Sequence, residues 1–115
     1  MNRRQTMYHS NKLTREYLLR EEYDQIWLKP HLRRKDRVFA QQGMYLATDL
    51  WNLFDGIAFK EGILFFLQIK TNAWAPERPI MEFLNQYVQF SDTIKAMIIN
   101  VRKKKKHWIV ETRFL

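Results

Sequence analysis

The chain has no cysteine, and its 115 residues include only three glycines and three prolines. The lack of cysteine excludes disulfides, thiolate zinc sites and cysteine nucleophiles. Three glycines are too few for the glycine-rich loops that hold nucleotide phosphates. The sequence also has no apolar run long enough to span a membrane and no apolar signal-peptide segment near its start. We therefore expect an intracellular, cytoplasmic protein without a membrane partner.

Positive charge and aromatic residues, by contrast, are abundant. The formal net charge is +8, and 46% of the residues are hydrophobic. The aromatic residues include four Trp, five Tyr and eight Phe. This composition predicts one folded domain over residues 1–115, with a polar, frayed segment at 1–10. A large positive charge on a small domain favours a polyanionic partner, with nucleic acid first and an anionic membrane surface second.

Hydrophobic periodicity predicts an α/β protein with the element order α-β-β-β-α-β-β. A helix is expected from a cap at Ser10 or Asn11 to about Tyr23, and a second, amphipathic helix begins near Pro79. Strands are expected at 25–29, 53–59, 63–70, 94–101 and 107–115. The second and third of these runs are too apolar for a sheet with one wet face, so helices should cover both faces of a central sheet.

Two segments are rich in basic residues. The first, an expected loop, contains Lys29, Arg33, Arg34, Lys35 and Arg37, and the second, an expected turn, contains Arg102, Lys103, Lys104, Lys105 and Lys106. Such side chains contact nucleic-acid phosphates and supply affinity without sequence specificity. For the second segment, a solvated turn that discourages aggregation at a sheet edge is the alternative.

The apolar runs at 53–59 and 63–70 contain three polar exceptions, which are Asp55, Gln68 and Lys70. If Glu61 and Gly62 form a two-residue hairpin loop, Asp55 faces Gln68, whereas a three-residue loop puts Leu67 opposite Asp55. Side chains alternate along a strand, so Gln68 and Lys70 point to the same face. Opposed residues are close enough for one divalent ion to touch both Asp55 and Gln68.

These residue types suit phosphodiester hydrolysis. A carboxylate and neutral oxygens hold Mg²⁺ or Mn²⁺, which prefer oxygen ligands and keep bound water. The metal polarises a phosphoryl oxygen and lowers the pKa of its water, and a neighbouring lysine stabilises the developing negative charge. The structural alternative is that Asp55 only ends a strand and that Lys70 only reaches solvent.

Phe54-Asp55, a turn and then Gln68-Ile69-Lys70 resemble the motif of the PD-(D/E)XK nuclease superfamily. This superfamily includes restriction endonucleases, archaeal Holliday junction resolvases and many phage nucleases. The resemblance extends from about Leu13 to Trp108, and the segment 49–58 is similar to small phage and archaeal-virus members. It implies a restriction-endonuclease-like αβββαβ core and a Mg²⁺-dependent DNA endonuclease, in the host cytoplasm for a viral member.

The resemblance also implies roles for individual residues. Asp55 matches the metal-binding aspartate and Lys70 the motif lysine, while the carbonyl of Ile69 is implied as a further metal ligand. Gln68 stands where most members have Glu or Asp, although Mrr-like restriction enzymes also carry Gln there. Members often place a glutamate of the first helix in the site, and Glu16 is our choice over Glu21 and Glu22.

Three functions follow from these patterns. The first is a structure- or sequence-directed DNA endonuclease, which in many relatives acts as a homodimer. The second is a nuclease-fold protein that binds DNA without cutting it, because Gln68 removes a negative charge from the metal site. The third is a membrane-surface or RNA-binding module without catalysis. Trp51 and Trp74 flank the expected site, where they either stack on bases or belong to the core.

Overall fold

The computed structural model describes residues 3–30, 50–51 and 53–115. This part of the chain is α/β, with two helices and a five-stranded mixed sheet. Along the chain the elements are α1 (Arg3–Arg20), β1 (Asp24–Leu28), β2 (Gly56–Lys60), β3 (Ile63–Thr71), α3 (Glu77–Tyr87), β4 (Ile94–Lys104) and β5 (His107–Phe114). The expected α/β class and the order of the elements are therefore confirmed for the described residues.

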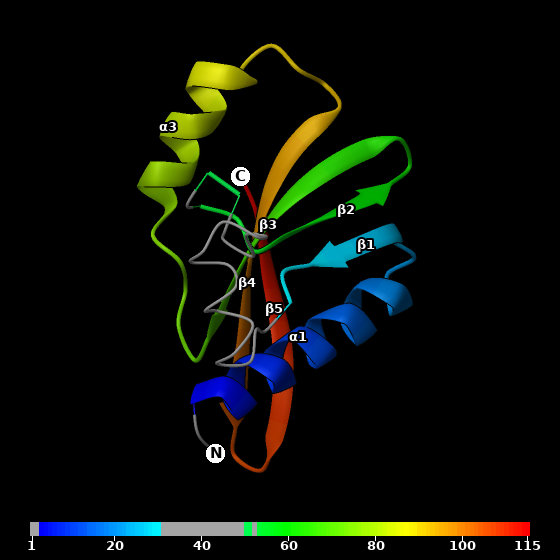
Figure 1. Ribbon diagram of the computed structural model, residues 1–115, viewed down its shortest axis with the longest axis vertical. Helices are drawn as coiled ribbons and strands as arrows, with labels where there is room; N and C mark the ends of the chain where they lie inside the picture. Colours follow the sequence, from blue (N-terminus) through cyan, green and yellow to red (C-terminus); the bar gives the residue numbers. More distant parts are fainter. Residues whose placement is uncertain (1–2, 31–49, 52) are drawn as a thin grey trace, which may run out of the picture.

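The strands lie in the sheet in the order in which they occur in the chain, β1-β2-β3-β4-β5 (Figure 1). Neighbouring strands are antiparallel except β3 and β4, which are parallel. A parallel pair needs a crossover connection, and α3 supplies it. This crossover brings residues about thirty positions apart into register, such as Lys70 and Asn100.

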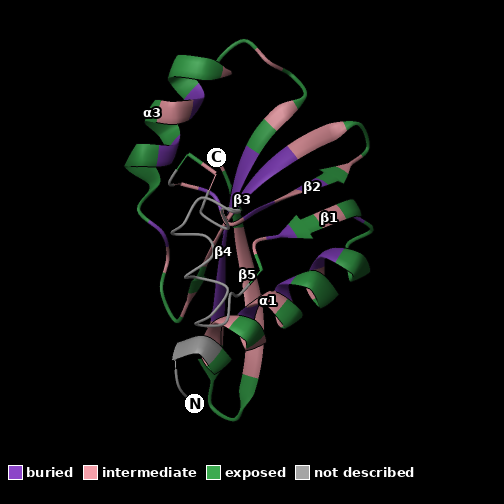
Figure 2. Cartoon of the chain, in the orientation of Figure 1, coloured by how far each residue is buried: buried purple, intermediate pink, exposed green. Residues whose placement is uncertain are grey.

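The sheet is covered by helices on both faces, as its apolar strands predicted. One buried cluster contains Leu18 of α1 with Leu67 and Ile99, and the other contains Ile80 and Leu84 of α3 with residues of the opposite sheet face. Figure 2 shows buried residues along the central strands and exposed residues on the outer sides of both helices. Each helix therefore closes one face of the same sheet.

The first helix differs from the expectation. It begins at Arg3, so the segment expected to be frayed is helical from there on, and Ser10 and Asn11 lie inside the helix rather than at its cap. Ser10 is 2% exposed because it packs on the sheet, where its hydroxyl is 2.6 Å from that of Thr71. The polar residues from Arg3 to Ser10, which were expected to be frayed, are thus helical, and the turn with Ser10 docks on β3.

The hairpin between β2 and β3 has the two-residue loop. Lys60 pairs with Ile63, and both loop residues have positive φ, 53° at Glu61 and 79° at Gly62. Two positive φ values are typical of the type I′ turn, whose twist matches that of the strands. This turn fixes the register of the whole hairpin.

The second basic segment is mostly strand rather than turn. β4 continues through Lys104, which pairs with His107, and only Lys105 and Lys106 form the loop. In the first basic segment Lys29 follows β1. The expected phosphate contacts Arg33, Arg34, Lys35 and Arg37 lie outside the described residues, as does the loop expected there.

Candidate functional site around Asp55

Asp55 lies one residue before β2 and is bonded to β3 through both its backbone and its side chain. Its N–H donates to the carbonyl of Leu67 at 2.7 Å, and its Oδ2 accepts the N–H of Ile69 at 2.8 Å. In a regular strand pair a backbone carbonyl of the neighbouring strand would accept the N–H of Ile69. Here the carboxylate of Asp55 accepts it instead. This hydrogen bond holds Asp55 at the residue between Gln68 and Lys70.

Gly56 allows β1 to approach this point closely. A Cβ on Gly56 would lie 2.5 Å from the carbonyl oxygen of Trp27 and 2.8 Å from Cδ2 of Leu28, both shorter than real Cβ contacts. Because glycine has no Cβ, β1 can pair tightly with β2 here. Just beyond β1, the N–H of Lys29 donates to the carbonyl of Asp55 at 2.7 Å. The glycine thus positions Lys29 beside the aspartate.

Lys29 also meets Asp55 through its side chain. Its Nζ lies 3.8 Å from Oδ1 of Asp55, and the two side chains are only 20% and 16% exposed. Such partly buried charges interact more strongly than an ion pair in bulk water. We expected Lys29 to contact phosphate, and the structure adds a role as counter-ion of the candidate metal ligand.

A small pocket of about 40 Å³ adjoins this ion pair. Its lining residues come from α1, from the end of β1 and from the hairpin: Met7, Ser10, Asn11, Lys29, Asp55, Ile69 and Thr71. Asn11 donates from Nδ2 to the carbonyl of Lys29 at 3.0 Å. No sequence pattern indicates that Ser10, Asn11 and Thr71 lie near Asp55, because only the docking of α1 brings them there.

Gln68 and Lys70 share one face of β3, as their spacing predicted. Their neighbours Leu67 and Ile69 pack into the cluster under α1, so the side chains of Gln68 and Lys70 alternate to the side of the sheet that α3 covers. Asp55 is level with Gln68 in the hairpin register. Its side chain nevertheless lines a pocket together with Ile69, on the face of the sheet opposite to the side chain of Gln68. The structure brings Asp55 to the backbone of β3, and it does not give the two side chains a common face.

The amide of Gln68 has an unusual environment. Its Oε1 is buried and accepts no hydrogen bond from the described part of the chain, whereas Lys70 is exposed. A buried acceptor without a partner costs free energy, and most such groups in native proteins are satisfied. The amide oxygen therefore has the capacity to accept a donor or to bind a cation.

The glutamates expected from the first helix do not line the pocket at Asp55. Glu16 is exposed and lines a wider neighbouring groove of about 580 Å³, which shares Asn11 and Lys29 with that pocket. Glu21 and Glu22 are exposed beyond the end of α1. Among these three residues, only Glu16 lines a space that adjoins the pocket.

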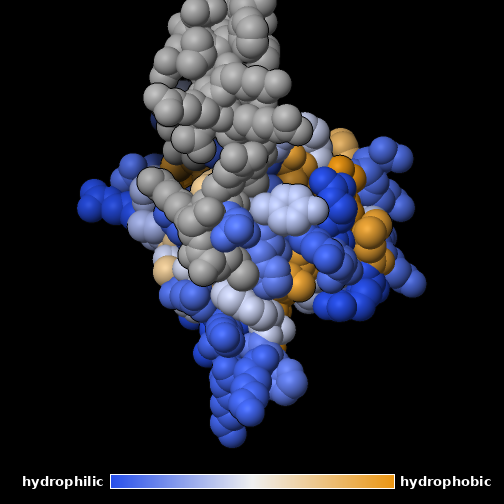
Figure 3. Space-filling view, turned by 60° about the horizontal axis from the view of Figure 1, so that its bottom comes forward, coloured by the Kyte–Doolittle hydropathy of each residue, from blue (hydrophilic) through white to orange (hydrophobic). Residues whose placement is uncertain are grey.

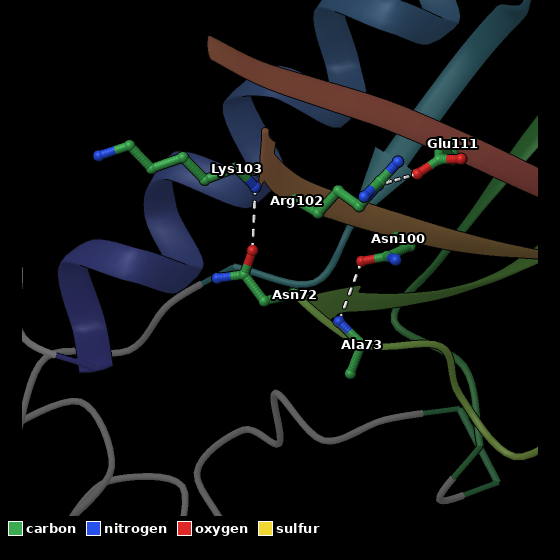
Figure 4. A network of polar contacts seen from close by, with 6 residues as sticks. All are labelled: Asn72, Ala73, Asn100, Arg102, Lys103 and Glu111. Carbon is green, nitrogen blue, oxygen red and sulfur yellow. Dashed lines mark hydrogen bonds and ion pairs between the residues drawn. The ribbon is translucent and has the colours of Figure 1, made fainter. Parts of the chain in front are cut away.

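The β4–β5 hairpin is joined to the end of β3 by side-chain amides (Figure 4). Asn72 accepts the N–H of Lys103 through Oδ1 at 2.9 Å, and Asn100 accepts the N–H of Ala73 through Oδ1 at 3.0 Å. Arg102 pairs with Glu111 across the two strands. The side chain of Lys103 extends away from this network, so the amides hold its backbone and leave its ammonium in solvent.

The lysines of this hairpin, Lys103 to Lys106, are all exposed, and no ion pair engages them within the described part of the chain. Figure 3 shows that hydrophilic residues predominate on one face of the molecule and that hydrophobic residues gather there in small patches. The exposed lysines provide a concentrated positive charge at one end of the sheet.

The described residues contain no group of three or more His, Cys, Asp or Glu side chains arranged to hold a metal ion. None of their helices is long and apolar enough to cross a membrane. Asp49, at the edge of the motif segment, lies outside the described residues. Among described acids, Asp55 is the one that is hydrogen-bonded to the segment Gln68-Ile69-Lys70, the QxK segment.

Comparisons of the chain with protein-family models, with curated proteins and with solved structures find no match.

Proposed function

We propose that this protein is a metal-dependent DNA endonuclease with a restriction-endonuclease-like core. The observation that carries the proposal is the 2.8 Å hydrogen bond between the carboxylate of Asp55 and the N–H of Ile69, the residue between Gln68 and Lys70. It joins the acid and the QxK segment of the motif at one point. The mixed sheet with a single parallel pair crossed by α3 also supports the proposed core.

The donor atoms at this point suit a hard cation. Asp55 would supply one charged oxygen and the carbonyl of Ile69 a neutral one, and the amide of Gln68, which lies on the other face of β3, would join them only if the Asp55 carboxylate turned toward it. The buried, unpartnered Oε1 of Gln68 fits such a ligand role. A single carboxylate suggests a weakly held Mg²⁺ or Mn²⁺ that keeps several waters. When bound, the ion would activate a water and polarise a phosphoryl oxygen.

The lysine side chains of the protein would act on the nucleic acid. Lys70 is exposed on the same side of β3 as Gln68, and its ammonium stabilises the negative charge that develops on the reacting phosphate. The lysines of the β4–β5 hairpin bind phosphates farther along the backbone. Binding and chemistry therefore use different groups, which mutations can separate.

A second candidate function is DNA binding without cleavage. Its support is the 3.8 Å ion pair, because Lys29 already balances the charge of Asp55. Without a second carboxylate at Gln68, the attraction for a divalent cation is smaller than in a site with two acids. A two-fold homodimer stays a prediction under either function, and with the nuclease function it would cut two strands.

The test is incubation of the full chain with Mg²⁺ or Mn²⁺ and linear, single-stranded, flapped and four-way DNAs. Cleavage by wild type that Asp55→Asn abolishes supports the nuclease. Asn retains an oxygen that accepts the Ile69 N–H, so the variant should stay folded and still bind DNA. Lys70→Ala should lower the rate on the order of 10²–10³-fold. DNA binding without cleavage in any metal favours the second candidate, and cleavage by Asp55→Asn at the wild-type rate overturns the site.

A further inference from the structure

An open aromatic pocket lies on the side of the sheet that α3 covers. It has a volume of about 350 Å³ and is lined by Trp51, Phe66, Phe83, Tyr87, Val88 and Ile94, none of which is charged. Although they line a pocket, Trp51 and Tyr87 are 60% and 65% exposed. Two large rings therefore stand at the surface with faces accessible to a ligand.

The rings of this pocket are held in place by one another. Phe83 contacts both exposed rings, with its centroid 5.2 Å from that of Trp51 and 5.0 Å from that of Tyr87. Trp51 also stands edge-on to Phe66 at 5.4 Å and 89°. Aromatic pairs at such distances are stabilising. These ring contacts support one another in the arrangement that forms the pocket.

The pocket lies in line with Gln68 and Lys70 on one face of β3. Phe66 forms part of its wall, and Phe66, Gln68 and Lys70 project from the same face of β3 because they are two residues apart. Four residues along a strand span about 13 Å. Beyond Lys70, Asn72 connects β3 to Lys103 of the basic hairpin. Aromatic rings, an exposed lysine and the lysine-rich hairpin thus follow one line along the sheet.

We propose that the pocket binds one unpaired nucleobase of a nucleic acid whose backbone passes Lys70 toward the β4–β5 hairpin. This inference rests on the proposed function and names its substrate class as DNA that is single-stranded or carries an unpaired nucleotide. Every base has a π-face, so stacking on aromatic rings tolerates any sequence, while cations follow the backbone. The net charge of +8 and the lysines in line with the pocket favour this occupant over an apolar protein segment.

The test is fluorescence-anisotropy binding, without metal, of oligothymidylate, of an abasic oligomer of equal length and charge, and of a blunt duplex. Stacking of one base makes oligothymidylate bind about 5–150-fold more tightly than the abasic oligomer. Trp51→Ala and Tyr87→Ala each remove most of that difference and leave the affinity for the abasic oligomer unchanged. Phe90→Ala is the matched control, because Phe90 is 91% exposed and does not line the pocket.

Other outcomes overturn the inference in distinguishable ways. Equal binding of oligothymidylate and the abasic oligomer overturns the base pocket and leaves DNA binding through the lysines intact. No binding of any of the three nucleic acids overturns the proposed function together with the pocket. Self-association that Trp51→Ala and Tyr87→Ala both abolish would mean that a second copy of the chain covers the rings. Tyr87→Ala keeps the test valid if Trp51→Ala does not fold.

Discussion

Lys29 and Asp55 are bound to each other twice. The backbone N–H of Lys29 donates to the carbonyl of Asp55 at 2.7 Å, and the ammonium lies 3.8 Å from the carboxylate Oδ1. The backbone bond keeps the side chains together, because the lysine cannot move away without breaking the pairing beyond β1. A divalent cation at Asp55 would therefore compete with the ammonium group of Lys29.

Replacement of Lys29 should strengthen metal binding. In Lys29→Met the competing ammonium is removed while an apolar stem of similar length remains, so the Kd for Mn²⁺ should fall about 2–5-fold, an effect of the size expected for a partly exposed ion pair. Isothermal titration calorimetry measures it. Lys95→Met, which removes an exposed lysine from the start of β4, should leave the Kd unchanged. In an Asp55→Asn background the effect of Lys29→Met should vanish, and its persistence there would show that the two residues are not coupled at the metal.

An acid at position 68 should make the stability of the fold depend on metal. Gln68→Glu adds a negative charge where the amide oxygen is buried, so the metal-free variant should unfold at a lower temperature than wild type. Mn²⁺ at about 10–100 times its Kd should return about 1.4–2.7 kcal/mol of stability. Differential scanning calorimetry with and without Mn²⁺ measures both effects. Gln86→Glu, on the exposed side of α3, is the matched charge change, and equal metal responses in the two variants would contradict a metal ligand at position 68.

The basic hairpin should set the salt dependence of DNA binding. Replacement of Lys103, Lys104, Lys105 and Lys106 by Gln should lower the slope of log affinity against log salt, by about 0.9 on duplex DNA for every phosphate that is no longer neutralised. Binding isotherms at several salt concentrations give the slope. Lys95→Gln serves as the control from the other end of β4. An unchanged slope in the hairpin variants would mean that these lysines are only solvated.

Tyr23 should make the fold sensitive to high pH. Burial raises the pKa of Tyr23 above its ordinary value of about 10, and the negative charges of Tyr17 and Glu21 raise it further. The folded state then holds the phenol proton more tightly than the unfolded state, so stability is full below pH 10 and is lost as the pH rises through the folded pKa. Chemical denaturation between pH 8 and about 11 should show this loss in wild type and less of it in Tyr23→Phe.

Tyr23→Phe also tests whether the hydroxyl contributes to stability at neutral pH. Within the described residues the phenol oxygen of Tyr23 has the sulfur of Met97 as its partner, at 3.9 Å, and its ring packs on Phe65. Tyr23→Phe keeps the ring, so the free energy of unfolding at pH 7 should change by less than about 1 kcal/mol. A larger decrease at neutral pH would show an interaction of the hydroxyl that the packing does not account for.

Much of the local structure could be predicted from the sequence. Alternation and turn chemistry predicted the strands but left two hairpin registers open, and the structure has the register of the two-residue turn with positive φ at Glu61 and Gly62. The apolar spacing around Ile80 and Leu84 predicted α3 and its buried face. These features depend on residues close together in the chain, so the local pattern of apolar and polar residues is enough to predict them.

The candidate site could be predicted only in part, since its geometry depends on contacts between distant segments. Strand spacing predicted that Gln68 and Lys70 share a face, but not that Asp55 turns its carboxylate to the backbone of Ile69. The sequence determined which residues carry charge and which strands they lie on. The tertiary structure alone decided that Lys29 is paired with Asp55 and that Ser10 is buried on Thr71, because the close approach of β1 at Gly56 and the docking of α1 on the sheet create those contacts.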